Sequence, residues 1–243
     1  MKITVVIPVF NERETLTPLA EQAGYQLRAF DHRILFIDDG STDGSWDVLL
    51  ALHAARDDVD AVRFGRNAGK TAALAAGFAR ADGDIVITMD ADLQDDPKEI
   101  PRFIAKIEDG YDVVTGWKVM RHDPWTKRFP SRVYNRVIAS MFSLDIHDVN
   151  CGYKALRTDV AKRLPLHGGM HRLIPVLAAR TGARVTEIAV QHHPRRWGAS
   201  KYGIERFWQG MRDAFLVFFS KAHPAAEGLP DAPGLVVEEL RHP

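Results

Sequence analysis

Short runs rich in valine and isoleucine alternate with longer helix-compatible stretches through the first half of the chain. The runs occupy residues 3–9, 33–37, 59–64, 84–89 and 111–115. Runs of this length and β-branched content are typical of buried strands. Strands that alternate with helices predict a mostly parallel sheet with helices on both faces. The sequence therefore predicts an α/β protein, and its 243 residues suffice for one large domain.

Composition narrows the function classes. Apolar residues make up 46% of the chain and charged residues 26%, which is ordinary for a globular protein in water. The formal net charge is zero, which argues against a nucleic-acid partner. One cysteine, Cys151, excludes an internal disulfide and favours a reducing compartment. We expect no membrane-spanning helix, because no apolar stretch is long enough.

The fourth run leads into Asp90-Ala91-Asp92-Leu93-Gln94. If the extended backbone continues past Met89, Asp90 and Asp92 project from the same face. Two adjacent carboxylates repel each other and are costly to desolvate, and a divalent cation removes that cost. Open α/β sheets bind ligands at the carboxyl ends of their strands, so the pair predicts a Mg²⁺ or Mn²⁺ site. Taken alone, the pair is also compatible with a solvated turn.

The ends of the first two strands carry residues suited to a nucleotide. Phe10 could lie against a base or ribose, and the carboxylate of Asp39 could accept a hydrogen bond from a base imide N–H. Each also has a structural interpretation, Phe10 as a core residue and Asp39 as a turn residue. Because parallel strands end at one edge of the sheet, we expect both residues to lie near Asp90.

The loop at residues 65–71, Gly-Arg-Asn-Ala-Gly-Lys-Thr, superficially resembles a phosphate-binding loop. It has three residues between its first glycine and its Gly-Lys pair, where that motif needs four, and it follows the third strand. We therefore exclude an NTPase. Lys70, near a predicted helix N-terminus, could still meet a phosphate, and a surface lysine is an equal alternative.

The second half carries a local excess of positive charge. Between residues 118 and 136 the bases Lys118, Arg121, Lys127, Arg128, Arg132 and Arg136 accompany one acid, Asp123. The predicted helix at 204–220 is apolar nearly all round in its last turns, which suits a core, a partner or a membrane surface. Residues 221–243 are dominated by Pro, Ala, Gly and acids, which predicts a disordered tail.

Together these segments resemble the family 2 glycosyltransferases with the GT-A fold. They are most similar to the branch of dolichyl-phosphate mannose synthase and the polyprenyl-phosphate glycosyltransferases. The matching segments are residues 6–12, 38–43, 67–70, 90–94, Ser131 with Asn135, 148–154 and 195–201. The most specific parts are the Asp-Ala-Asp-Leu-Gln run and the loop that ends in Ala199-Ser200-Lys201.

The resemblance implies a GT-A domain over residues 1–220. It implies an inverting transfer of a sugar from a UDP- or GDP-hexose to a polyprenyl or dolichyl monophosphate. Asp90 and Asp92 would hold Mg²⁺ or Mn²⁺. The implied nucleotide-binding residues are Pro8, Phe10, Glu12, Asp39, Lys70, Asp90 and Ala91. The implied catalytic residues are Asp92, Gln94, Arg128, Arg195 and Lys201, and those at the acceptor phosphate are Lys118, Ser131, Arg132 and Ser200. The expected location is the cytoplasmic face of a membrane, with the membrane surface or a membrane-embedded protein as partner.

Two features depart from this branch. Lys118 stands where many relatives have arginine, and lysine lacks the bidentate guanidinium fork. Many bacterial relatives also continue into membrane-spanning helices, which this sequence lacks.

Two other functions stay open. One is a family 2 enzyme that transfers to a sugar hydroxyl of a glycan or cell-envelope acceptor, which needs a carboxylate base such as Asp95, Asp96, Asp145 or Asp148. The other is a non-catalytic nucleotide-sugar-binding subunit. The sequence also leaves open the choice of UDP or GDP, the sugar and the oligomeric state, a homodimer included.

Overall fold

The computed structural model describes residues 1–119, 125–194, 205–219 and 235–242, with residues 125–132 and 205–210 as backbone only. The predictions for Arg128, Ser131 and Arg132 concern side chains outside this description. Those for Arg195, Ser200 and Lys201 concern residues outside the described ranges. None of the described helices is both long enough and apolar enough to cross a membrane.

An eight-stranded sheet forms the centre of the molecule, in the order β7-β5-β6-β4-β1-β2-β3-β8. The strands are β1 (Lys2–Val9), β2 (Asp31–Asp38), β3 (Val59–Phe64), β4 (Ile85–Thr88), β5 (Val113–Lys118), β6 (Lys154–Arg157), β7 (Val185–Val190) and β8 (Val236–Leu240). The pairs β1·β2, β1·β4, β2·β3 and β5·β7 are parallel. β6 is antiparallel to both β4 and β5, and β8 is antiparallel to β3. The predicted mostly parallel sheet is confirmed.

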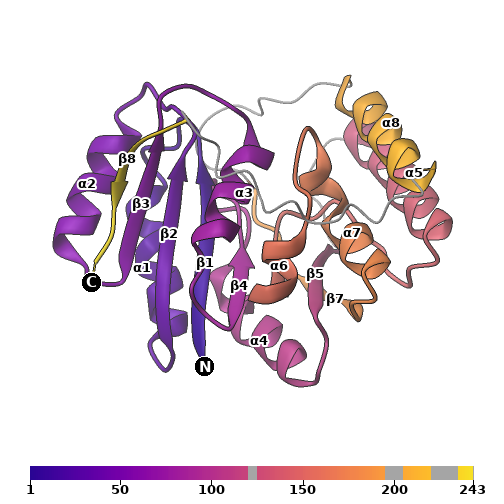
Figure 1. The fold of residues 1–243 in the computed structure, drawn as a ribbon, viewed down its shortest axis with the longest axis horizontal. Helices are drawn as coiled ribbons and strands as arrows, with labels where there is room; N and C mark the ends of the chain where they lie inside the picture. Colours follow the sequence, from indigo (N-terminus) through magenta and orange to yellow (C-terminus); the bar gives the residue numbers. More distant parts are fainter. Residues whose placement is uncertain (120–124, 195–204, 220–234, 243) are drawn as a thin grey trace.

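Helices cover both faces of this sheet (Figure 1). The helices are α1 (Leu16–Leu27), α2 (Ser45–Ala55), α3 (Lys70–Arg80), α4 (Ile100–Glu108), α5 (Trp125–Met141), α6 (Thr158–Arg163), α7 (Ile174–Arg180) and α8 (Glu205–Phe219), with 3-10 turns η1 (Pro97–Glu99) and η2 (Met170–Leu173). One apolar cluster joins α1, α2 and α4 to one face, and a second joins α3 and α5 to α8 to the other. Successive residues of β1 point to opposite faces of the sheet, so Val5 belongs to the first cluster and Val6 to the second.

The α3 helix lies very close to β1 because of one glycine. A Cβ at Gly77 would collide with the side chain of Val6. Small residues around it, including Ala73 and Ala76, are buried in the same cluster. This close packing sets the position of the first residue of α3, Lys70, relative to the ends of β1 and β4.

Asn is a common helix-capping residue, so Asn11 could cap a helix that starts at residue 12. Instead, α1 begins at Leu16, and Asn11 has a positive φ of 54°. The Asn11 side chain accepts a hydrogen bond from the backbone N–H of Thr42 at 2.8 Å instead. Asn tolerates the left-handed region better than other non-glycine residues, so it turns the chain here and joins the ends of β1 and β2.

The predicted disordered tail is wrong for residues 236–240, which form β8 on the edge of the sheet. Leu235, Val236 and Leu240 pack against the two apolar clusters. The average composition of residues 221–243 hid this short apolar run. Figure 1 shows β8 at one end of the sheet and the pair α5 and α8 at the other.

Candidate active site

The carboxyl ends of β1, β2 and β4 meet at one edge, as the sequence predicts. Backbone N–H of Asp39 donates to the carbonyl of Val9 at 2.8 Å, and that of Met89 donates to Val6 at 3.4 Å. Pro8 pairs with Ile37 in the parallel register of β1 and β2. Phe10 and Glu12 are half-buried in the segment that follows β1.

That segment is fastened to the turn after β2 by hydrogen bonds. Backbone N–H of Asn11 donates to Ser41 Oγ at 2.9 Å, and that of Glu12 donates to Ser45 Oγ at 3.1 Å. These bonds fix the backbone around Phe10 and Glu12 relative to the turn after β2. The segment thus forms a wall beside the end of β1.

Asp39 holds the loop that leads into α3. Its two carboxylate oxygens accept hydrogen bonds from the backbone N–H groups of Ala68 and Gly69, at 2.6 Å and 2.9 Å. Burial raises the pKa of Asp39, and these two bonds oppose the rise. A nucleotide base would therefore have to share a carboxylate that already supports the loop. The sequence identified the residue but not this structural function.

Lys70, the first residue of α3, forms an ion pair with Asp90. Burial acts to raise the pKa of Asp90, but the positive charges of Lys70 and Lys118 outweigh it and hold the pKa below its usual range. His171, which shares a hydrogen bond with Thr71 Oγ1, contributes in the same direction. Lys70 is therefore part of the cluster around Asp90 and not a surface lysine.

The extended backbone does not continue through Asp92. β4 ends at Thr88, and residues 91–93 form a turn in which Leu93 has a positive φ of 58°. The condition under which strand alternation would align Asp90 with Asp92 is therefore not met. Asp92 is buried within the turn, and its Oδ1 accepts from the backbone N–H of Gln94 at 3.1 Å. Ala91 between them is also buried.

Gln94 connects this turn to the segment after β7. The side-chain Nε2 of Gln94 donates to the backbone carbonyl of His193 at 3.1 Å. The backbone carbonyl of Gln94 accepts from the backbone N–H of His193 at 2.8 Å. His193 Nε2 lies 3.1 Å from Asp96 Oδ2. The segment that leads toward Arg195 is therefore anchored next to the Asp92 turn.

Lys118 points into the protein. Its Nζ lies 2.9 Å from Oδ1 of the buried Asp95, and 13% of its side chain is exposed. Burial alone would lower the pKa of Lys118. Electrostatic interactions with Asp95, Cys151 and Asp90 have the larger, opposite effect, so the pKa lies above its usual range. Asp95 also accepts from the backbone N–H of Asp90 at 3.3 Å. An acceptor phosphate at Lys118 would have to compete with Asp95.

Two residues that the sequence did not place at the donor site complete the cluster. Asp95 links Lys118 to the backbone of Asp90. A Cβ at Gly152 would lie 3.0 Å from both carboxylate oxygens of Asp90 and from Lys70 Nζ. The Gly152 carbonyl accepts from Thr88 Oγ1 at 2.7 Å, so the chain before β6 closes against the end of β4. The position of Gly152 in the 148–154 segment was the available signal for it.

The donor set fits a hard divalent cation. Asp90 and Asp92 supply carboxylate oxygens at the carboxyl edge, the ligands that Mg²⁺ and Mn²⁺ prefer. The ammonium group of Lys70 forms an ion pair with Asp90, which indicates that the surroundings of the Asp90 carboxylate favour positive charge. His53, Asp60 and His242 form another cluster of potential ligands. Asp60 is the second residue of β3, at the opposite edge of the parallel sheet, so this cluster is separate from Asp90.

The family model for glycosyl transferase family 2 matches residues 4–164, about two thirds of the chain. The chain therefore belongs to this family of glycosyltransferases.

Among its relatives are transferases named for polyprenyl phosphates. It is 35% identical over 236 residues to dodecaprenyl-phosphate galacturonate synthase of Rhizobium johnstonii, covering 94% of this chain and 70% of the relative. It is 38% identical over 215 residues to undecaprenyl-phosphate 4-deoxy-4-formamido-L-arabinose transferase of an Enterobacter species, covering 87% and 66%. The chain thus spans about two thirds of these relatives' length.

Solved structures share the fold. Glucosyl-3-phosphoglycerate synthase from Mycobacterium tuberculosis, solved with Mn²⁺, uridine diphosphate and phosphoglyceric acid, superposes with a TM-score of 0.68 at 20% identity. The match covers 89% of this chain and 78% of that chain. At this identity the likeness establishes the GT-A fold alone.

Proposed function

We propose that the protein transfers a sugar from a nucleoside-diphosphate sugar to a polyprenyl monophosphate, with inversion at the anomeric carbon. The observation that carries the proposal is the Lys70–Asp90 pair at the carboxyl edge, beside the Asp92 turn and the Asp39-held loop. The relatives named for dodecaprenyl and undecaprenyl phosphate support this acceptor class.

The chain's own groups would act by binding and orientation. The wall formed by Phe10 and Glu12 would bound the nucleotide, and Lys70 would pair with its diphosphate. A divalent cation held by Asp90 and Asp92 would neutralise charge on the departing nucleoside diphosphate. Arg128, Arg132, Arg195 and Lys201, with Ser131 and Ser200, are proposed to surround the acceptor phosphate.

The reaction itself needs little proton transfer from the protein. One oxygen of the acceptor monophosphate forms a bond to C1 of the sugar while the bond from C1 to the diphosphate breaks. A monophosphate is largely ionised near neutral pH, so its oxygen attacks without a strong general base. Attack opposite the leaving group inverts the configuration at C1.

The contacts of three of the four candidate bases, all but the exposed Asp145, favour this acceptor over a sugar hydroxyl. Asp95 is buried and paired with Lys118. Asp148 is buried, and its Oδ1 accepts from Asn135 Nδ2 at 2.9 Å. Asp96 Oδ2 lies 3.1 Å from His193 Nε2, and Asp96 Oδ1 accepts from the backbone N–H of Lys98 at 3.0 Å. A carboxylate committed to such contacts is a poor proton acceptor for a substrate.

The test is a transfer assay with a panel of radiolabelled UDP- and GDP-sugars, Mn²⁺ and undecaprenyl phosphate. We expect label in the organic phase with undecaprenyl phosphate and none with undecaprenol, which offers only a hydroxyl. Equal transfer to both lipids would support the hydroxyl acceptor instead. No transfer from any donor would support the non-catalytic alternative.

The first prediction concerns the same assay. Asp92→Ala should lower turnover by at least roughly a hundredfold, the scale of a lost electrostatic contribution to the transition state. Asp57→Ala is the control, because Asp57 is exposed and lies in the turn between α2 and β3. Circular dichroism should be unchanged in both. Wild-type turnover in Asp92→Ala would contradict the proposed role of Asp92.

A further inference from the structure

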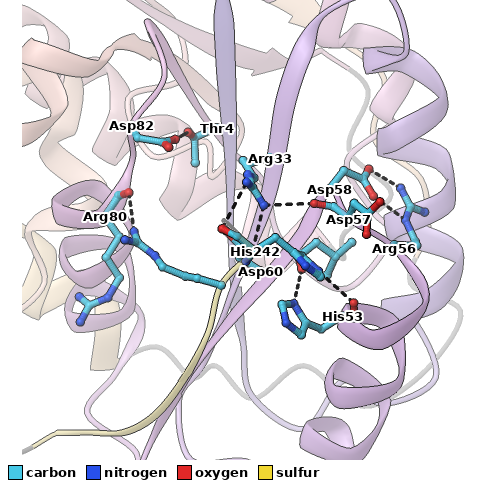
Figure 2. Close-up of polar contacts among 12 residues, drawn as sticks. Thr4, Arg33, His53, Arg56, Asp57, Asp58, Asp60, Arg80, Asp82 and His242 are labelled. Carbon is cyan, nitrogen blue, oxygen red and sulfur yellow. Dashed lines mark hydrogen bonds and ion pairs between the residues drawn. The ribbon is translucent and has the colours of Figure 1, made fainter.

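Three potential metal ligands meet where the C-terminal segment lies on the edge of the sheet. His53 comes from the last turn of α2, Asp60 from the start of β3, and His242 from the residues just after β8. One ligand atom from each lies within 4.8 Å of the other two. Figure 2 shows the three side chains, with Arg33 next to Asp60 and His242. Asp60 is near the amino end of β3, whereas Asp90 follows the carboxyl end of β4, so the two sites are separate.

Backbone carbonyls orient both imidazole rings. His53 Nδ1 lies 2.7 Å from the carbonyl oxygen of Val59, and His242 Nε2 lies 3.0 Å from that of His53. A carbonyl only accepts, so each of these nitrogens carries the proton. In the neutral rings the lone pair is then on His53 Nε2 and on His242 Nδ1. A carbonyl that accepts from the rear nitrogen is the usual support of a metal-bound histidine.

Asp60 supplies a buried carboxylate. Its Oδ1 accepts from the backbone N–H of His242 at 3.0 Å and from Arg33 Nη1 at 3.3 Å. Both bonds use the same oxygen, which leaves Oδ2 able to bind a cation. A pocket of about 60 Å³, lined by Asp60, His242 and Arg33 among others, opens beside them. It has room for water molecules in the remaining coordination positions.

We propose that His53, Asp60 and His242 bind one divalent transition-metal ion of the zinc class. Two imidazole nitrogens and one carboxylate oxygen suit Zn²⁺, and water would complete the coordination. The two rings are stacked, with centroids 3.9 Å apart and planes at 26°. Binding turns the planes further apart, so that their lone pairs converge on the ion. The ion would join α2, β3 and the segment after β8, and so hold β8 on the sheet.

Cobalt spectroscopy of the whole chain tests this site separately from the donor site. Co²⁺ in a site with nitrogen ligands and low coordination number absorbs visibly, whereas an octahedral all-oxygen site absorbs weakly. We expect the visible band in the wild type and in Asp92→Ala, because Asp92 lies at the other edge. We expect its loss in His53→Gln and His242→Gln. His167→Gln, at an exposed histidine elsewhere, is the control and should keep the band.

Thermal unfolding gives a second measurement. Zn²⁺ at a hundredfold excess over its Kd should raise the Tm of the wild type by roughly 5–10 °C. His242→Gln should lose most of this shift, although the folded variant retains its circular dichroism. A cobalt band that survives both glutamine variants would overturn the proposal, and so would the absence of any band in the wild type. Neither result bears on sugar transfer, which would be measured with Mn²⁺.

Discussion

At the centre of the candidate donor site, the ammonium group of Lys70 rests against the carboxylate of Asp90. The contact is enclosed on a third side by the backbone of Gly152. A metal ion on Asp90 would meet the positive charge of Lys70 at short range. Under the proposed function, Lys70 and a divalent cation would compete for one carboxylate until a diphosphate offered Lys70 another partner.

Lys70→Met tests that competition. Removing the ammonium should raise the affinity for Mn²⁺ in the absence of nucleotide roughly tenfold, equivalent to about 1.4 kcal/mol. Affinity for UDP or GDP should fall, because the diphosphate loses a cation partner. Calorimetric titration with Mn²⁺ and with nucleotide measures both. Lys70→Arg keeps the charge and should bind Mn²⁺ like the wild type, and weaker Mn²⁺ binding in Lys70→Met would refute the competition.

The sequence located the residues of this cluster better than it described their contacts. Asp39, Lys70 and Asp90 come together because parallel strands end at one edge, a rule that needs no side-chain detail. The partners of Asp39 were not predictable, because any nearby N–H can satisfy a carboxylate. Gly152 was missed for another reason. Its contact with the end of β4 joins residues 64 positions apart, and local pattern does not encode such a pairing.

At the scale of elements, α8 carries an apolar surface that the other described residues leave exposed. Ala214 and Val217 are buried, whereas Phe215, Leu216, Phe218 and Phe219 are exposed. Phe218 contacts Phe142 of the segment after α5 edge to face, with ring centroids 5.6 Å apart. The other aromatic rings are available to a lipid surface, which agrees with the proposed lipid-linked acceptor.

Phe215→Ser with Phe219→Ser should weaken binding to vesicles that contain anionic lipid. Each substitution removes a large apolar side chain from the bound surface, so we expect at least a tenfold loss of partitioning in co-sedimentation. The control is Tyr25→Ser, since Tyr25 on α1 is 62% exposed, as is Phe219. Membrane docking by α8 would be contradicted by equal partitioning of all three proteins.

The sequence predicted the strands with a strong apolar pattern and missed a short strand at the edge of the sheet. The third strand was predicted over its observed residues, Val59–Phe64. β8 was missed because two of its five residues are glutamates, one of which, Glu239, pairs with Arg80 and Arg241 at the edge of the sheet. An edge strand with charged side chains has little apolar pattern of its own.

At the scale of the whole molecule, one buried cation couples stability to pH. Lys154 is buried and donates to the carbonyl of Cys151. Burial lowers the pKa of Lys154 from 10.5 to about 8. At pH values between about 8 and 10.5, the Lys154 side chain is protonated in the unfolded chain but largely deprotonated in the folded protein. Stability contributed by this residue therefore rises with pH through that range.

Urea unfolding can measure this rise. Between pH 8 and pH 9 the wild type should gain about 1 kcal/mol of unfolding free energy relative to Lys154→Met, which has no proton to release. Burial raises the pKa of Cys151 to about 11 from 9.0, which lowers stability as pH rises above 9. The comparison is therefore confined to the lower range. A difference between the two proteins that is independent of pH would contradict the lowered pKa of Lys154.

The antiparallel β6 strand lies between β4 and β5 and hydrogen-bonds to both. The residues just before it close against Asp90, which follows β4 at the carboxyl ends of the parallel strands. A fragment that stopped before residue 150 would thus leave β4 with an open edge and Asp90 without its neighbour. The described strands offer no junction between a donor module and an acceptor module, so the two halves of the sheet are expected to unfold as one unit.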